Sequence, residues 1–235
     1  MTALTAAWAS LAISPLFSLA LTLLAYQLAL SIFHRSGQRA WANPALLAIL
    51  LITAVLQIAH IPYATYFAGA QIIHFLLGPA TVALAVPLFA YGRRLKRQAI
   101  PILLALLAGS ATAAGSAMLI AKLLGASPVT VLSLAPKSVT TPIAMGVAEA
   151  IGGVPALAAV FVILTGIFGA TCFPTVFRGL RIHDPAAQGL AVGVTSHGLG
   201  TARAFLFSEE MGAFAALAMG LNGLLTAVAL PLLLH

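Results

Sequence analysis

Charged residues are scarce in this sequence. Only 6% of its 235 residues are Asp, Glu, Lys or Arg, and Asp and Glu together number four. A soluble domain is about a quarter charged, so a water-soluble globular fold is excluded. Apolar residues make up 62% of the chain, and its mean hydropathy is +1.10. The sequence therefore predicts an integral membrane protein, for which lipid is the main solvent.

Cysteine is almost absent as well. The single Cys172 excludes an internal disulfide and a cysteine-based metal site. The sequence shows no nucleophile–base pair and no cluster of metal ligands, so we expect no enzyme activity, no metal and no cofactor. The N-terminus has no basic start, and the apolar run that follows is long enough to span a membrane, so no cleavable signal is predicted.

Long apolar segments dominate the rest of the chain. A membrane-spanning helix needs about 20 residues, and seven segments come close to that length. We therefore predict an all-α polytopic protein with one transmembrane domain over residues 1–235. The segments cover residues 9–33, 44–61, 70–91, 100–124, 155–175, 187–207 and 211–234.

Basic residues follow the first, third and fifth segments. Short cytoplasmic loops of membrane proteins carry such charge, so the net charge of +7 indicates orientation and not nucleic-acid binding. The pattern predicts a membrane protein with its N-terminus outside and its C-terminus inside. It also predicts that residues 126–154 begin and end on the same side. The clusters are Arg35 and Arg39; Arg93, Arg94, Lys96 and Arg97; and Arg178 and Arg181.

The stretch "PKSVTTPIAM" (136–145) lies inside that segment and carries Lys137 between apolar runs. Pro136 and Pro142 break helical hydrogen bonding, and the neighbouring hydroxyls can bond the freed backbone groups. We predict a re-entrant hairpin that enters the membrane without crossing it. The alternative is a polar outer loop with Lys137 in water.

Two halves of the chain resemble each other. "NPALLAILLI" (43–52) matches "VPALAAVFVI" (154–163), and residues 68–89 match residues 185–207. The charge-derived topology places the matched segments in opposite orientations. This is the signature of inverted-topology repeats in secondary transporters, whose substrate site lies near the bilayer midplane. The predicted repeat halves are residues 9–125 and 126–235.

Each half contains a predicted interruption of a spanning helix. The first is at Gly78 and Pro79, where proline removes a helical hydrogen bond. The second is "TSHGLGTARA" (195–204), in which Gly198 and Gly200 flank Leu199. A half-helix that begins near Gly200 would direct its N-terminal amides towards an anion.

The predicted charge within the membrane is positive. Lys137 and Arg203 together would cost on the order of 5–7 kcal/mol at the bilayer centre, so we expect them to face a cavity. Of the acids, Asp184 is predicted at the cytoplasmic end of its segment and Glu209 and Glu210 in an outer loop. Only Glu149 is predicted at depth. A small anionic substrate suits this balance.

Candidate site residues follow from these breaks. The substrate-binding set is Lys137, Ser138, Thr140, Thr141, Ser196, His197, Gly198, Gly200, Thr201 and Arg203; the helix breaks are Gly78, Pro79, Pro136 and Pro142; Glu149 and His197 are candidates for a coupled proton. Alternatives stay open for three of them. Arg203 can reach the interface, His197 can be a packed histidine, and Glu149 can pair with Lys137 or lie at the surface.

Four motifs resemble those of the LrgB/CidB family. They are "LLGPATVALAVPL" (76–88), "PKSVTTPIAM", "IGGVPALAAVFVILTGIFGA" (151–170) and "SHGLGTARA" (196–204), and the resemblance runs from about residue 40 to the C-terminus. The family is described as polytopic membrane proteins tied to control of murein hydrolases and autolysis. The sequence departs from the family pattern after "PIAM", where an acid is common and Gly146 stands here.

The resemblance implies two functions. Relatives include the plastidic glycolate/glycerate translocator and bacterial proteins linked to pyruvate uptake, which implies a carrier for small monocarboxylates. Other members are holin-like or antiholin-like, which implies a pore component or regulator of autolysis with a small LrgA/CidA partner. Paired polar breaks favour the carrier, since a pore needs one continuous lined path. We expect a homo-oligomer, namely a dimer.

Overall fold

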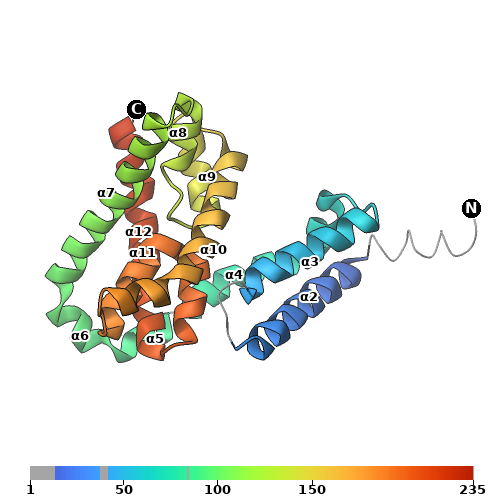
Figure 1. The fold of residues 1–235 in the computed structure, drawn as a ribbon, viewed down its shortest axis with the longest axis horizontal. Coiled ribbons are helices and arrows are strands. Elements are labelled where there is room, and N and C mark those ends of the chain that lie inside the picture. The colour runs from blue at the N-terminus through green and yellow to red at the C-terminus, as the bar shows by residue number, and fades with distance from the viewer. Residues whose placement is uncertain (1–13, 38–41, 84, 235) are drawn as a thin grey trace, which may run out of the picture. The chain divides into compact units, whose positions relative to one another are not determined.

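The computed structural model describes residues 14–37, 42–83 and 85–234, and in these ranges helices are joined by short connections, with no strand among them (Figure 1). The all-α prediction is confirmed. Four helices, α2, α7, α10 and α12, are long and apolar enough to cross a membrane. The helices are α2 (Pro15–Arg35), α3 (Pro44–Ile58), α4 (Tyr63–Ala83), α5 (Ala85–Ala90), α6 (Gly92–Arg97), α7 (Ala99–Leu123), α8 (Pro128–Leu134), α9 (Thr141–Ala150), α10 (Pro155–Gly179), α11 (Pro185–Phe205) and α12 (Glu209–Leu234).

The chain forms two compact units, residues 1–83 and 84–235. In the first unit α2 packs against α3 and α4. The Thr22 hydroxyl and the Tyr66 hydroxyl lie 2.7 Å apart and join α2 to α4. Asn43 caps α3 by accepting hydrogen bonds from the amides of Ala45 and Leu46, which is a strong start signal for a helix.

Helix α4 continues through Gly78 and Pro79 to Ala83. The interruption predicted at this pair is therefore wrong. A proline inside a helix removes one hydrogen bond, and the turns before and after it can still form a single helix. The sequence indicated a break because Pro79 removes one helical hydrogen bond, and α4 continues in spite of that loss.

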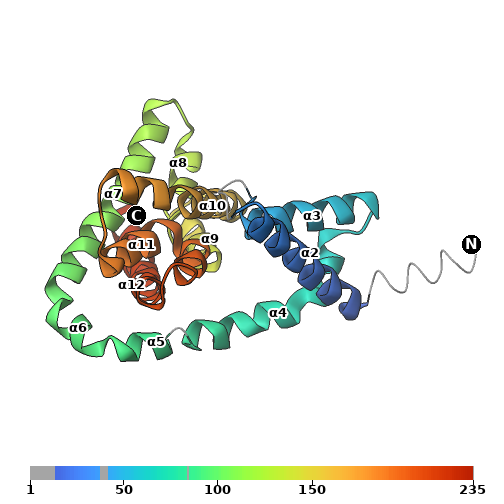
Figure 2. The same cartoon turned by 60° about the horizontal axis from the view of Figure 1, so that its bottom comes forward.

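In the second unit α7, α11 and α12 pack side by side, and α10 covers α11 (Figures 1 and 2). Two buried clusters fix their directions. Ile102, Ala186 and Phe214 form one cluster, and Leu106, Val194 and Ala218 form the next. Residue numbers rise together on all three helices, so α7, the first part of α11 and α12 run in the same direction.

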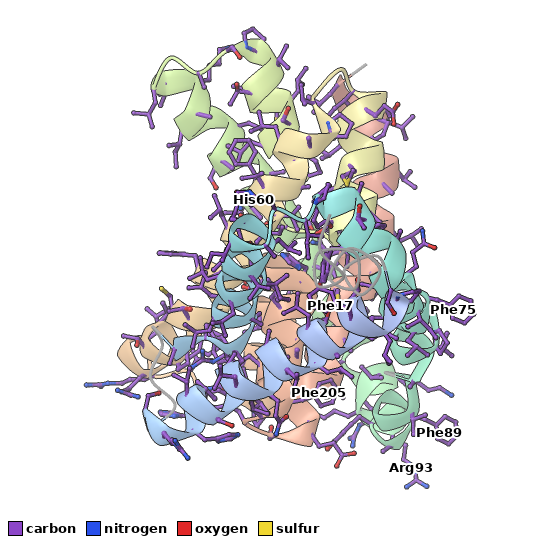
Figure 3. All side chains as sticks on the ribbon, turned by 90° about the vertical axis from the view of Figure 1, so that its right-hand side faces the viewer. Phe17, His60, Phe75, Phe89, Arg93 and Phe205 are labelled. Carbon is purple, nitrogen blue, oxygen red and sulfur yellow. The ribbon has the colours of Figure 1, made fainter. Side chains whose placement is uncertain are left out.

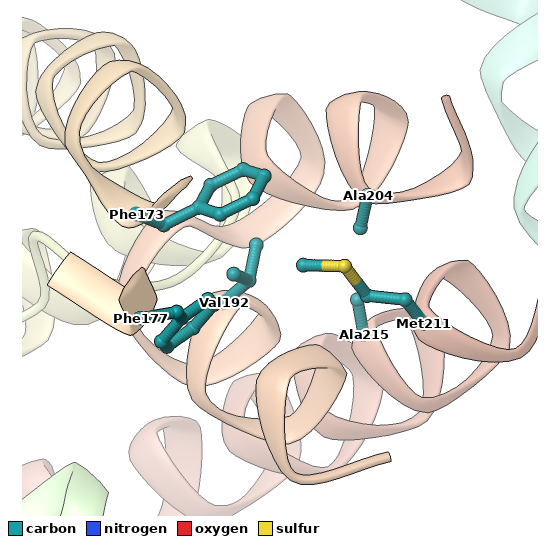
Figure 4. Close-up of a cluster of buried hydrophobic side chains, with 6 residues drawn as sticks. All are labelled: Phe173, Phe177, Val192, Ala204, Met211 and Ala215. Carbon is teal, nitrogen blue, oxygen red and sulfur yellow. The ribbon is translucent and has the colours of Figure 1, made fainter. Parts of the chain in front are cut away.

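Helix α11 turns back on itself at His197, whose φ of 41° and ψ of −133° are not helical. The turn divides it into an entering limb (185–196) and a returning limb (198–205). Along a straight helix residues 192 and 204 would lie about 18 Å apart. Instead Val192 and Ala204 belong to one buried cluster with Met211 (Figure 4). The break predicted within residues 195–204 is therefore confirmed.

Arg94 joins the start of α11 to the start of α12, where the α11 hairpin ends. Its guanidinium donates to Asp184, which caps the entering limb, at 2.7 Å and to Glu210 in the first turn of α12. The Ala187 amide and Arg94 hold the pKa of the Asp184 carboxyl below its usual range. Exposed basic residues of α6 surround this point, and Arg93 projects away from the helix in Figure 3. We call this end of the unit the basic end.

Another hairpin lies at the opposite end; because it comes earlier in the chain, we call it the first hairpin and the hairpin of α11 the second hairpin. The first hairpin consists of α8, a connection over residues 135–140, and α9. Ala135, Val147 and Ile151 pack with Leu230, near the end of α12, and with Met118, near the end of α7. At 7 and 10 residues α8 and α9 are shorter than the roughly 20 residues that a crossing needs. The two hairpins therefore enter the unit from opposite ends.

This arrangement corrects part of the predicted topology. Residues 187–207 do not form a crossing, because the chain returns to the basic end, and Glu210 lies beside Arg94 and not in a loop at the other end. Helices α7 and α12 run in the same direction, so the inverted pairing predicted for segments 100–124 and 211–234 is wrong. The C-terminal end of α12 lies opposite the basic cluster, which contradicts the prediction that both lie inside.

Single-cysteine labelling checks the turn in α11. In a Cys172→Ser background, His183→Cys and Ser208→Cys should react with an impermeant maleimide from the same face of the membrane, because the hairpin begins and ends at the basic end. Ala126→Cys should react from the other face. Labelling of residues 183 and 208 from opposite faces would show that α11 crosses the membrane.

Candidate functional site

The connections of the two hairpins meet beside the middle of α10. Val162 of α10 packs with Val139 and Ala144 of the first hairpin. The backbone carbonyl of the same residue lies 2.9 Å from Nε2 of His197, in the turn of the second hairpin. One turn of α10 thus contacts both hairpins, and the polar stretches that the sequence singled out come together here.

Asn222, in the middle of α12, also contacts both hairpins. Its side-chain amide donates to the Ser138 carbonyl and to the Val194 carbonyl, each at 3.2 Å. Its amide oxygen accepts a hydrogen bond from the Ser110 hydroxyl of α7. The Asn222 side chain is buried. Sequence reasoning missed this residue, although it stands alone as an amide in an apolar segment.

A pocket of about 580 Å³ opens where the hairpins meet α10. Lys137 comes from the first hairpin, and Thr195 and Ser196 come from the second. The remaining lining residues are Leu164, Thr165, Phe168 and Gly169 of α10. Lys137 is the only charged side chain among the described residues that line this pocket, and its ammonium lies 3.2 Å from the Ser138 hydroxyl.

The lining can bind one small anion. The Lys137 ammonium supplies a compact positive charge with three donors. Hydroxyls of Thr165, Thr195 and Ser196 can donate to oxygens of the same ligand. No carboxylate or imidazole lines the pocket among the described residues.

The structure separates several predicted residues from this pocket. Arg203 lies on the returning limb, buried, with its guanidinium 5.9 Å from the centre of the Phe173 ring. It does not line the pocket, because the limb carries it back towards the basic end. Glu149 is exposed near the end of α9, away from Lys137, so the pairing of these two residues is not seen.

His197 matches the alternative of a packed histidine. It is buried, its ring is bonded to the Val162 carbonyl, and its own carbonyl accepts from the Thr201 hydroxyl at 2.7 Å. His197 and Thr201 therefore support the turn and do not line the pocket. Gly166 lies against the imidazole, since a Cβ there would meet Nε2 at 2.6 Å.

The remaining predicted residues shape the hairpins. Thr140 precedes α9 as its N-cap and Thr141 begins it, with Pro142 in the first turn. Pro136 is buried in the connection between α8 and α9. Gly198 follows the turn, and Gly200 faces Val192 across the two limbs, where a Cβ would meet Val192 Cγ1 at 2.7 Å.

Five of the seven lining residues were not among the predicted site residues. Leu164, Thr165, Phe168 and Gly169 lie in an apolar run of α10, and Thr195 begins the quoted stretch 195–204 but was not selected. Thr165 and Gly169 are one turn apart, on the face of α10 that meets the hairpins. The sequence alone does not show which face of α10 meets the hairpins, so these residues could be found only from the fold.

Comparison with known proteins gives a consistent family. A model of the LrgB-like family matches residues 22–235. The chain is 41% identical to "Uncharacterized protein YwbG" of Bacillus subtilis (strain 168), over 92% of this chain and 96% of that protein. It is 37% identical to an uncharacterized protein of Haemophilus influenzae, over 90% of this chain and 91% of the relative.

A third relative carries a functional name. The chain is 30% identical to "Antiholin-like protein LrgB" of Bacillus cereus (strain B4264), over 93% of this chain and 95% of that protein. No solved structure matches the chain.

Substitution of Gly169 checks the close approach of α10 to the second hairpin. A Cβ at residue 169 would overlap the Ser196 hydroxyl. Gly169→Ala should therefore lower the free energy of unfolding by about 1–3 kcal/mol, as overpacking does. Gly115→Ala is the control, since nothing lies within 4 Å of its Cβ, and it should be neutral or stabilising by up to about 1 kcal/mol. Thermal unfolding in detergent measures both. Equal stability of the two variants would contradict the packing.

Proposed function

Because the chain belongs to the LrgB-like family of membrane proteins, we propose that it is a secondary carrier of small monocarboxylates. The candidates are glycolate, glycerate, lactate and pyruvate, carried across a bacterial inner membrane. One observation supports this proposal most. Two hairpins enter the second unit from opposite ends, and their connections meet at a pocket that holds a single lysine.

The hairpin arrangement suits alternating access. Carriers with inverted elements keep one site at the midplane and open it to each side in turn. Here α7 leads into the first hairpin and α10 leads into the second. The two hairpins enter the unit from opposite ends, so the two pairs point in opposite directions. Each hairpin would form the barrier on its own side. If the basic end is cytoplasmic, then the second hairpin enters the membrane from the cytoplasmic side and the C-terminal end of α12 lies on the outer side.

The pocket favours an anion with one charge. A lysine within the membrane costs about 2.5–3.5 kcal/mol on insertion scales, so it is retained where it faces a cavity or a ligand. One ammonium neutralises one carboxylate, while a dicarboxylate would bring a second, uncompensated charge. The hydroxyls around Lys137 suit a ligand rich in oxygen.

Proton coupling stays a prediction with weaker support. Glu149 and His197 were its candidates, and neither lines the pocket. A proton could still accompany the anion through Lys137, so the pH dependence of uptake decides the point. The dimer and the small LrgA/CidA-type partner also stay predictions.

A pore component or regulator of autolysis is the second candidate. The printed name of the Bacillus cereus relative, an antiholin-like protein, favours it. A pore conducts solutes without saturation and discriminates weakly between them, whereas a carrier saturates and selects. The two functions are therefore separated by the same assay.

Uptake into liposomes checks the proposal. Purified protein should take up radiolabelled glycolate or pyruvate saturably. Lys137→Met should weaken anion binding by about 2–5 kcal/mol, as truncation of one partner of a buried charge pair does. The control is Lys122→Met, which removes an exposed lysine near the end of α7 and should transport normally.

Several results would change the proposal. Uptake by Lys137→Met with wild-type affinity would remove this pocket from the site. Saturable uptake that ignores an acid-outside gradient would keep the carrier and discard the proton. Leakage of glycolate and a neutral sugar at comparable rates would reject the carrier in favour of the pore.

A further inference from the structure

Asn222 occupies an unusual position in α12. Its side chain is only 1% exposed, in a helix whose neighbouring residues are mostly Ala, Gly and Leu. A buried amide in an apolar segment is costly unless its donors and acceptor are bonded. Asn222 meets this condition, because its NH₂ group donates to one carbonyl in each hairpin and its oxygen accepts from the Ser110 hydroxyl. The residue therefore joins α7, α12 and the two hairpins at one point.

The two carbonyls that Asn222 binds lie where regular helix ends. In an unbroken α11 the Val194 carbonyl would accept from the amide of residue 198, but the turn at His197 diverts the chain there. Ser138 lies in the connection between α8 and α9, outside both helices. Lipid offers no donor for such carbonyls, and the Asn222 amide supplies one to each.

Both bonds act on residues next to the pocket. Lys137, Thr195 and Ser196 line the pocket. Ser138 directly follows Lys137 in the chain, and Val194 directly precedes Thr195. Asn222 itself does not line it. A displacement of either carbonyl would move the lysine or the hydroxyls that are proposed to hold the anion.

We infer that Asn222 is the positioning residue that holds both hairpin connections at the pocket. This inference rests on the proposed carrier function for its effect on transport. The amide has two N–H donors, one for each hairpin. Opening of one hairpin therefore breaks one of these bonds and leaves the other in place.

Three variants test the inference in a Cys172→Ser background. Asn222→Asp keeps the shape of the side chain and removes the NH₂ group, so at least one of the two carbonyls loses its donor: a carboxylate donates to neither and a carboxylic acid to one at most. Ser110→Ala is milder, because it keeps Asn222 and removes only the bond that orients its amide. Ser133→Ala is the matched control. It removes a buried hydroxyl that donates to the Val129 carbonyl of α8 and accepts from the Val154 amide at the start of α10, away from Asn222.

Two readouts are measured for each variant. In glycolate uptake, Asn222→Asp should raise KM about tenfold or more, since a lost bond to a buried carbonyl is worth about one such factor. Ser110→Ala should show a smaller rise, and Ser133→Ala should keep the wild-type KM. The second readout is the reaction of Val139→Cys with a small permeant maleimide. Val139 is 1% exposed, so release of the connection should speed its reaction at least about tenfold.

The outcomes separate the inference from the proposed function. If no variant, including the parent, takes up glycolate, the carrier proposal fails, and faster labelling in Asn222→Asp alone still supports the positioning role. Wild-type KM and labelling in both Asn222→Asp and Ser110→Ala would overturn the inference. So would equal changes in Ser133→Ala, because they would show a general loss of stability. If Asn222→Asp does not fold, Ser110→Ala decides by the same two readouts.

Discussion

The structure depends on one constraint: lipid cannot hydrogen-bond the backbone, so a chain can turn within a membrane only where protein supplies the partners. The second unit has two such turns, and each is supported. Asn222 binds a carbonyl on either side, Val162 binds His197, and Thr201 bonds back to the His197 carbonyl. Away from the turn, at the base of the first hairpin, the Ser133 hydroxyl accepts from the Val154 amide. The bonds at the two turns supply the partners that lipid lacks.

The supported turns explain why polar residues concentrate in two short stretches of an apolar chain. Ser138 and Ser196 are buried next to Lys137, and the helices behind them bring small residues that allow close approach. Gly189 and Gly193 let the entering limb lie against the backbone of α12, since a Cβ on either would overlap a carbonyl of that helix. Close helix packing through small residues is the usual means of association in lipid. Packing and polar support thus produce one rigid centre with a pocket on its α10 side.

The sequence predicted the helices better than their directions. Five of the six predicted apolar segments other than 187–207 each coincide with one helix, segment 70–91 is divided between α4 and α5, and the break within 195–204 was located correctly. The direction of α11 was not accessible, because the positive-inside rule counts charges in loops and a loop with Glu209 and Glu210 looks the same at either face. Arg94, which binds Asp184 and Glu210 together, resolves it. Likewise Lys137 and Ser196 were found from their polarity, while Thr165 and Asn222 required the fold.

A structure determined in lipid nanodiscs with glycolate bound would test the central claim most directly. The account predicts both hairpins ending within the bilayer, with the carboxylate within hydrogen-bond distance of the Lys137 ammonium and the Ser196 hydroxyl. Asn222 should remain bonded to at least one of the two hairpin connections. A continuous α11 that crosses the bilayer, or a glycolate bound away from Lys137, would contradict the account.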